Sequence, residues 1–122
     1  KEEITPVEAA TSYNNFYEFG TGKEDPKENA GSLRTRPWSV AVEGLVRRPG
    51  SMPLETLLKG VPTVERVYRH RCVEAWSMVI PWVGVPLREV LTRLQPLPSA
   101  RFVEFTTLYD PKQMPGQRTP VL

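Results

Sequence analysis

Hydrophobic and polar positions alternate in three segments of the chain, and this pattern predicts three β-strands. In residues 37–46, "PWSVAVEGLV", the apolar Trp38, Val40 and Val42 alternate with Ser39, Ala41 and Glu43. Residues 63–72, "TVERVYRHRC", predict a second strand whose C-terminal end delivers Cys72. Residues 100–108, "ARFVEFTTL", predict a third strand near the end of the chain.

Three other segments carry the signals of short helices. Thr5 is expected to cap a helix over Pro6–Ser12, with Glu8 at the capping-box position. Residues 53–60, "PLETLLKG", predict a second helix that stops at its glycine. Residues 85–94, "VPLREVLTRL", place apolar side chains at helical spacing between two prolines.

The connections between these elements are rich in turn-forming residues. Residues 21–32, "TGKEDPKENAGS", predict a polar surface loop, and Pro49-Gly50 predicts the centre of a turn. The breaker-rich segment 109–117 follows the third strand. Strands and short helices therefore alternate, which predicts an α+β (mixed α/β) fold. No glycine-rich phosphate loop lies between them.

Composition narrows the class of protein further. The chain has 122 residues, which suits one domain or part of one, and its 13 prolines favour short elements. The net charge of +2 is small and the basic residues are interspersed with acids, which argues against nucleic acid as a partner. Residues 75–87, the longest nearly uncharged stretch, are too few to span a bilayer. Because the chain starts at Lys1 and ends in "QRTPVL", we expect a processed or partial chain.

The only cysteine, Cys72, follows the cationic residues 69–71, "RHR". A positive field favours the thiolate, the form that attacks electrophiles and binds soft metals. Alternation along a strand, however, points sequence neighbours to opposite faces. The sequence context therefore favours neither interpretation of Cys72, a buried structural thiol or a functional one. One Cys and one His are too few ligands for a zinc site.

Residues around Cys72 have two interpretations each. Trp76 and Trp82 are expected in the core, with a pocket wall over Cys72 as the alternative. Glu74 is expected to be a solvated acid, or else an acid or hydrogen-bond partner in a metal pocket.

Two further segments also have two interpretations each. Residues 12–20, "SYNNFYEFG", indicate either a helix end satisfied by Asn side chains or a polar loop that binds a cofactor. Thr106 and Thr107 suit a strand, although strand ends also line ligand crevices.

Taken together and in order, four segments resemble one family. They are "ATSYNNFYEFG", "RPWSVAVEGLV", "YRHRCVEAWSMVIPWVGVPL" and "FVEFTTLYDP". The chain resembles the catalytic subunits of the periplasmic protein-methionine-sulfoxide reductases, molybdopterin enzymes with the sulfite oxidase fold. The resemblance implies that residues 1–122 are the N-terminal portion of a single molybdopterin-binding domain, because the family's chain continues well beyond this length.

The resemblance also implies roles for individual residues. Cys72 takes the place of the catalytic thiolate that coordinates molybdenum. Asn14, Tyr17 and Glu18 match the loop that contacts the molybdopterin, and Thr107 matches a further cofactor contact. Two more residues, Asn15 and Glu74, are expected near the metal.

The activity implied by the resemblance is reduction of methionine sulfoxide in oxidised periplasmic proteins, a repair reaction that uses a molybdenum–molybdopterin cofactor. It implies export to the periplasm in folded form and a haem-containing membrane subunit as electron donor. An oxidase of sulfite or a related oxyanion is the alternative, weakened by Asn15 standing where a cation would be wanted. A non-catalytic binding module on the same fold is another. A thiol reductase using Cys72 directly is disfavoured, because this sequence has no second cysteine to resolve the intermediate.

Overall fold

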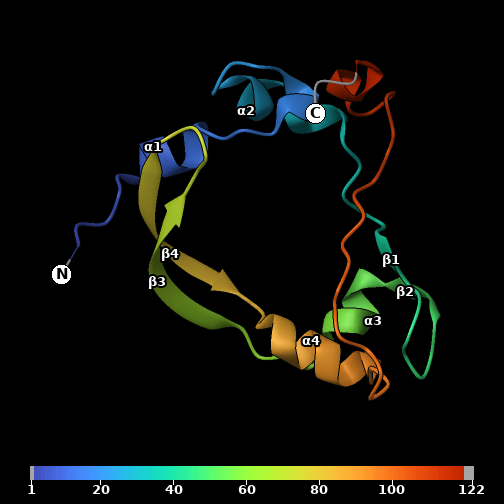
Figure 1. Cartoon of the computed structure of the whole chain (residues 1–122). Helices are drawn as coiled ribbons and strands as arrows, with labels where there is room; N and C mark the ends of the chain where they lie inside the picture. The colour runs from blue at the N-terminus through green and yellow to red at the C-terminus, as the bar shows by residue number, and fades with distance from the viewer. Residues whose placement is uncertain (1, 120–122) are drawn as a thin grey trace. The chain divides into compact units, whose positions relative to one another are not determined.

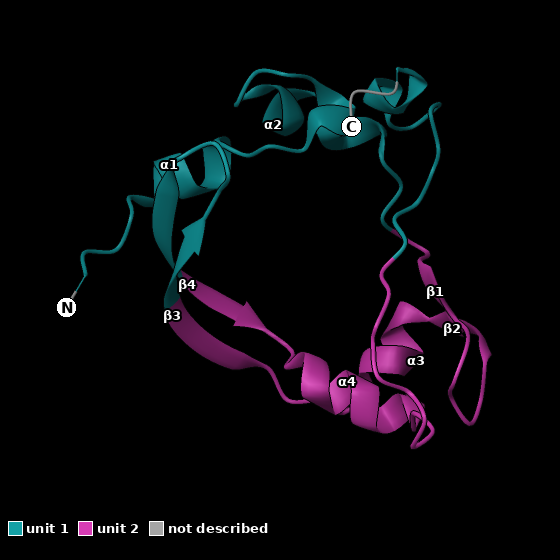
Figure 2. Ribbon diagram, viewed as in Figure 1, with its two compact units in different colours: residues 1–35, 68–80, 106–122 teal, residues 36–67, 81–105 magenta. Residues whose placement is uncertain are grey.

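The computed structural model describes residues 2–119, which gather into two compact units (Figures 1 and 2). Unit 1 is made of residues 1–35, 68–80 and 106–122, and unit 2 of residues 36–67 and 81–105. Short helices and paired strands occur together, which confirms the predicted α+β class.

Unit 1 combines short helices with the tip of a β-hairpin. Its helices are the α-helices α1 (Val7–Ser12) and α2 (Asp25–Asn29) and the 3₁₀ helices η1 (Tyr17–Phe19), η2 (Ala30–Ser32) and η3 (Pro115–Arg118). Strands β3 (Val64–Arg71) and β4 (Ser77–Gly84) pair with each other, and the end of this hairpin at residues 68–80 belongs to unit 1. The buried apolar side chains of the unit include Phe19, Met78, Val79 and Met114.

Unit 2 combines a second strand pair with two helices. Strands β1 (Ser39–Val42) and β2 (Gly50–Pro53) are antiparallel, with Val42 opposite Gly50. Helices α3 (Leu54–Leu58) and α4 (Leu87–Leu94) contact each other. Buried side chains of the unit include Val42 and Leu57.

Five predicted elements are confirmed, with shorter bounds in most cases. Helices α1, α3 and α4 lie where the sequence predicts them, and α4 ends at Leu94, followed by its C-cap Gln95, which adopts a left-handed conformation with φ 51°. Strand β1 covers the centre of its predicted segment. Strand β3 ends at Arg71, so Cys72 is the first residue beyond it.

The predicted cap of α1 is wrong. Pro6 occupies the N-cap position and makes no side-chain capping bond. The Thr5 hydroxyl instead accepts a hydrogen bond of 2.9 Å from the Val79 N–H, and the Thr5 N–H donates to the Val79 carbonyl at 3.0 Å. Pairing with β4 satisfies two backbone groups of Val79, a buried residue, so tertiary pairing prevails over local capping.

The predicted loop over residues 21–32 is also wrong, because it contains α2 and η2. Pro26 lies in the first turn of α2, where its fixed φ favours a helix, and its side chain is buried. Asp25 accepts a hydrogen bond of 2.8 Å from the Gly22 N–H, and the Asn29 side chain donates to the Phe19 carbonyl at 3.0 Å. Polar composition therefore concealed a helix that is stabilised through side-chain hydrogen bonds.

The strand assignments contain three errors. Strands β2 and β4 were not predicted, since β2 is short and β4 contains Pro81, which normally argues against a strand interior. Residues 100–108, predicted as a strand, adopt no regular secondary structure, and Phe102 is 94% exposed. An alternating pattern becomes a strand only when a neighbouring strand supplies hydrogen bonds, and no strand pairs with this segment among residues 2–119.

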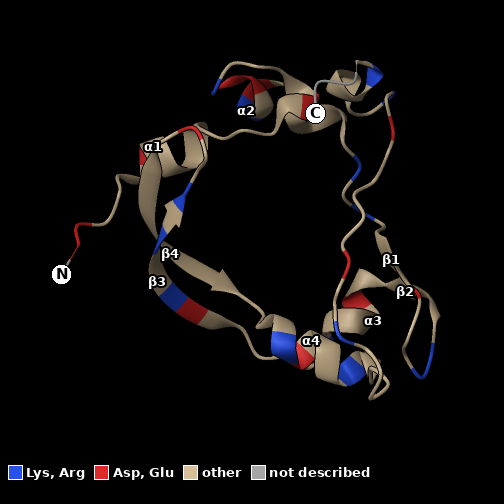
Figure 3. Cartoon of the chain, in the orientation of Figure 1, with Lys and Arg blue, Asp and Glu red and all other residues tan. Residues whose placement is uncertain are grey.

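Charge and hydropathy add two observations. Acidic and basic residues are interspersed along the described chain (Figure 3). Among the helices of residues 2–119, none has the length and apolar character needed to cross a membrane.

Candidate functional site

Cys72 begins the tight loop of the β3–β4 hairpin, at residues 72–76. The Cys72 carbonyl accepts a hydrogen bond of 3.2 Å from the Ala75 N–H, and the Cys72 N–H donates to the Trp76 carbonyl at 3.0 Å. Ala75 has a φ of 68°, in the left-handed region. This is a turn followed by a left-handed residue, the usual three-residue hairpin connection, in which glycine normally takes the left-handed position. The backbone of Cys72 is thus fixed on both its N–H and its carbonyl side.

The segment between α1 and η1 provides the second half of the site. The Asn14 side-chain oxygen accepts a hydrogen bond of 3.0 Å from the Phe16 N–H, and the Asn15 carbonyl accepts one of 3.0 Å from the Tyr17 N–H. The local Asn bond is the one expected from the helix-end interpretation of this stretch. These bonds turn the chain sharply and leave the Asn15 side chain for a longer-range contact.

That contact is with the cysteine. The Asn15 side-chain nitrogen donates a hydrogen bond of 2.7 Å to the Cys72 sulfur. The cysteine is half-buried and forms no disulfide. Sulfur therefore acts as a hydrogen-bond acceptor here, which suits a thiolate ligand.

Lys23 joins the same two segments and was not singled out from the sequence. Its ammonium forms an ion pair with the Glu74 carboxylate on the hairpin loop. The same nitrogen lies 5.2 Å from the centre of the Tyr17 ring and 3.4 Å from the Tyr17 hydroxyl. Its backbone carbonyl accepts a hydrogen bond of 3.1 Å from the Asn14 N–H. Glu74 is accordingly a paired carboxylate rather than a fully solvated one.

Helix η3 packs against η1, at the end of the segment that carries Asn14 and Asn15. A Cβ atom placed on Gly116 would overlap the Tyr17 carbonyl oxygen and would lie 2.8 Å from the Glu18 Cα. Met114, just before η3, is 2% exposed. The close approach of η3 to η1 therefore requires glycine at position 116.

The cations preceding Cys72 are engaged in other contacts. Arg69 forms an ion pair with Glu2 at 2.9 Å and donates a hydrogen bond of 2.7 Å to the Ser77 hydroxyl. The His70 ring packs against the Trp76 ring with centroids 6.0 Å apart. The positive field expected from residues 69–71 is thus reduced by the carboxylate partner of Arg69, while the Asn15 amide approaches the sulfur directly.

The structure brings most, but not all, of the predicted residues together. Asn14, Asn15, Tyr17, Cys72 and Glu74 are linked through the contacts above, and Glu18 lies beside Gly116. In the described part of the chain, no hydrogen bond or ion pair joins Thr107 to this group, and Thr107 is exposed in the irregular segment 101–110.

Neither Trp76 nor Trp82 is fully buried. Trp76, in the Cys72 loop, is half-buried. Trp82 is 39% exposed, so the expectation that it lies in the core is wrong.

Two buried polar atoms near the thiol lack hydrogen-bond partners among residues 2–119: the Asn15 side-chain oxygen and the Trp76 indole nitrogen. One is an acceptor and the other a donor. A buried polar group without a partner costs about 1–3 kcal/mol, so such atoms point to a missing ligand.

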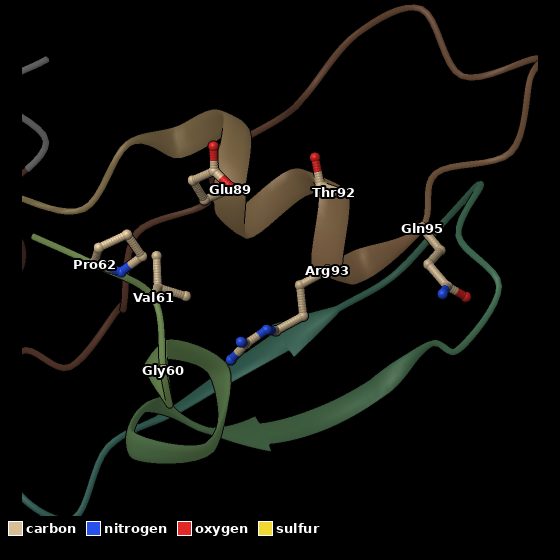
Figure 4. A pocket seen from close by; sticks show the side chains of 7 residues that line it. All are labelled: Gly60, Val61, Pro62, Glu89, Thr92, Arg93 and Gln95. Carbon is tan, nitrogen blue, oxygen red and sulfur yellow. The ribbon is translucent and has the colours of Figure 1, made fainter.

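A separate depression occurs in unit 2, between the residues after α3 and helix α4 (Figure 4). It encloses about 390 Å³ and is lined by Gly60, Val61, Pro62, Glu89, Thr92, Arg93 and Gln95. Arg93 donates hydrogen bonds to the carbonyls of Leu57 at 2.9 Å and Thr56 at 3.3 Å. Its guanidinium thus satisfies the C-terminal end of α3, a structural role. No cluster of three or more potential metal ligands from His, Cys, Asp and Glu occurs among the residues described.

Comparison with known proteins defines the family to which this fold and thiol-centred site belong. Residues 28–121 match the family described as oxidoreductase molybdopterin binding domain. The chain belongs to this family, as the resemblance implied.

Named relatives agree with this result. The chain is 61% identical over 117 residues to the protein-methionine-sulfoxide reductase catalytic subunit MsrP of Xanthomonas campestris pv. campestris, covering 96% of this chain and 36% of that protein. It is 56% identical over 121 residues to the MsrP catalytic subunit of Ralstonia nicotianae, covering 99% and 37% respectively. The chain therefore spans a little over a third of the length of the curated relatives it matches.

The residues present fit a molybdenum–pterin cofactor. The site offers a soft sulfur ligand at Cys72, together with the unpartnered acceptor of Asn15 and the unpartnered donor of Trp76. A pterin carries several amine and carbonyl groups that form hydrogen bonds of both kinds.

The contacts also identify two residues that sequence reasoning missed, Lys23 and Gly116. Lys23 lies in a segment of ordinary polar composition, and its ion pair with Glu74 joins residues far apart in the sequence. The only sequence signal for Gly116 is its place in the breaker-rich segment.

Proposed function

We propose that this chain is part of the catalytic subunit of a protein-methionine-sulfoxide reductase, which returns methionine sulfoxide in oxidised periplasmic proteins to methionine. The observation that carries the proposal is the hydrogen bond of 2.7 Å from the Asn15 amide to the Cys72 sulfur. It joins the two segments to which the family resemblance assigns the pterin and the metal, in a chain 55–61% identical to curated reductase subunits.

Cys72 would be the thiolate ligand of molybdenum, and Asn14, Tyr17, Glu18 and Thr107 would bind the pterin. When bound, the cofactor supplies a two-electron oxygen-atom transfer. In balance, a sulfoxide, two electrons and two protons give a thioether and water. The breaking bond is that between sulfur and oxygen of the oxidised side chain.

The residues of the chain prepare the ligand for this reaction. The hairpin hydrogen bonds on both sides of Cys72 fix its backbone, and Asn15 orients its sulfur. The Asn15 oxygen and the Trp76 indole N–H, which have no partner within residues 2–119, would be the acceptor and the donor for polar groups of the cofactor. Because these atoms are already buried, binding the cofactor gains hydrogen bonds at a small additional desolvation cost.

Two observations favour reduction of an uncharged sulfoxide over oxidation of sulfite. An anionic substrate would need cations free to bind it. Lys23 is paired with Glu74, and Arg69 is paired with Glu2, so both charges are already compensated. Asn15, which contacts the sulfur, is itself uncharged.

Three parts of the proposal concern the whole protein. Residues 1–122 would form the N-terminal portion of a single molybdopterin-binding domain. The protein would act in the periplasm after export in folded form. Its electrons would come from a haem-containing membrane subunit.

Replacement Cys72→Ser in the full-length protein tests the proposal. The parent should hold molybdenum and pterin and should reduce methionine sulfoxide in an oxidised protein faster than it oxidises sulfite. The variant should lose the reductase activity together with metal or with the thiolate-to-metal absorption. A fully active variant would exclude Cys72 as the ligand.

Two results would replace the proposal with an alternative. A parent free of molybdenum and pterin, after expression with molybdate and the cofactor machinery, would indicate a binding module. Alkylation of Cys72 by iodoacetamide in the cofactor-loaded parent would indicate a free nucleophile rather than a ligand.

A further inference from the structure

Lys23 contacts two separate segments of unit 1, and the family membership of the chain gives this residue no role. Its side chain contacts Glu74, two residues beyond Cys72, and Tyr17 in the loop between α1 and η1. Its backbone carbonyl accepts a hydrogen bond from the Asn14 N–H. One residue therefore contacts both segments that carry the proposed cofactor ligands.

We propose that Lys23 is a positioning residue that clamps the Cys72 hairpin to the Asn14–Glu18 loop and so slows release of the cofactor. The proposal rests on the proposed function for the identity of the cofactor, and on the contacts of Lys23 for the clamp.

Burial and charge support the clamp. The side chains of Lys23 and Glu74 are 36% and 32% exposed, so their ion pair is partly shielded from water. The ammonium also lies over the Tyr17 ring, where the ring's negative face attracts a cation. Each contact alone is modest at such exposure. Together they restrain the hairpin loop, to which the Asn15 to Cys72 hydrogen bond adds a further contact from the same polar loop.

The backbone contact makes the side-chain role separable. The bond from the Asn14 N–H goes to the Lys23 carbonyl, which any residue provides. Lys23→Met therefore removes the ion pair and the ring contact and keeps the fold of this segment. Lys27→Met is the matched control, because within residues 2–119 the Lys27 ammonium donates a hydrogen bond of 3.1 Å to the Ser12 hydroxyl and forms no ion pair with the Cys72 hairpin.

The experiment measures the rate of pterin release from the cofactor-loaded full-length protein. Lys23→Met and Glu74→Gln should each raise this rate about 2–5-fold, the range expected for a partly exposed ion pair. The double variant should release the pterin no faster than the faster single variant, because both changes break one clamp. Lys23→Arg, which keeps the charge, should stay closer to the parent than Lys23→Met.

Hydrogen exchange at residues 72–76 tests the clamp without the cofactor. In the full-length apoprotein these amides should exchange faster in Lys23→Met and in Glu74→Gln than in the parent. In Lys27→Met their exchange rate should equal that of the parent. A parent without pterin would overturn the proposed function, while this exchange result would still decide the clamp.

Three results would overturn the proposal: parental release rates in Lys23→Met, effects of Lys23→Met and Glu74→Gln that multiply in the double variant, or unchanged exchange at residues 72–76. In each case the contacts of Lys23 would be incidental to the site.

Discussion

The side-chain nitrogen of Asn15 lies 2.7 Å from the sulfur of Cys72, a residue 57 positions away in the sequence. The bond crosses from the loop after α1 to the loop of the β3–β4 hairpin. Its donor is an uncharged amide, so the sulfur is oriented without a competing cation that would attract anionic ligands.

Asn15→Asp replaces the amide donor with a carboxylate of the same shape beside the sulfur. Repulsion between carboxylate and thiolate should lower molybdenum retention by roughly 10–100-fold, the range for residues that orient metal ligands. Metal analysis of the full-length protein after dialysis measures this effect. Asn15→Leu, which removes the bond without adding charge, should retain more metal than Asn15→Asp; equal retention would contradict the role of charge.

Gly116→Ala should destabilise the protein by about 1–3 kcal/mol, as expected when a methyl group is forced into a packed contact. The added carbon would overlap the Tyr17 carbonyl oxygen and push η3 away from η1. Thermal unfolding of the full-length protein measures the loss. Gly31→Ala is the control, since a Cβ at Gly31 meets no atom within 4 Å. Equal midpoints for the two variants would show that η3 is displaced without cost.

Ala75→Gly should stabilise the hairpin by up to about 1 kcal/mol, because a residue with a Cβ pays about 1–2 kcal/mol in the left-handed region, partly offset by glycine's greater freedom when unfolded. The φ of Ala75 is 68°. Ala75→Val should have the opposite effect, since β-branching increases the steric conflict. Unfolding midpoints of both variants test the sign. A midpoint that falls in Ala75→Gly would place this residue outside the left-handed region.

Asp110 should make stability depend on acid pH. A hydrogen bond from the Gln113 side chain is the largest cause that lowers the pKa of the Asp110 carboxyl, followed among the lowering causes by the backbone N–H groups of Lys112 and Gln113 and the charge of Lys112. A lowered folded-state pKa stabilises the protein above the unfolded-state value and ceases to do so as the pH falls through the folded-state pKa.

Asp110→Asn should therefore unfold at a lower temperature than the parent at about pH 6, and the difference should shrink at about pH 3, below the ordinary aspartate pKa. Unfolding midpoints at the two pH values check this result. A difference that is the same at both would attribute the loss to geometry rather than to the charge of Asp110.

Local physics explains which elements the sequence could predict. Helix α4 carries its apolar residues on one face and lies between prolines, so its signal is complete within ten residues. Strand β4 lacks such a signal, because Pro81 interrupts it and only its pairing with β3 and the contacts of Thr5 make it a strand. Residues 101–110 show the converse, a local strand pattern that no described strand pairs with.

In the candidate site, too, local signals could be predicted from the sequence and tertiary contacts could not. Cys72 could be identified from its position after a predicted strand and from the family resemblance. The partners of its loop could not, because the Asn15 and Lys23 contacts join segments that approach each other only in the folded chain. Thr107, expected beside these residues, is exposed and linked to none of them by a hydrogen bond within the described chain.

The two hydrogen bonds that close the Cys72–Trp76 loop also bear on how this sequence can change over evolution. Substitutions at Val73, which is fully exposed, leave the loop closed. Inserting or deleting one residue between Cys72 and Trp76 would instead break the pairing that closes the loop and shift the sulfur relative to Asn15. The spacing from β3 to Trp76 is thus protected against length changes even where its residues are free to vary.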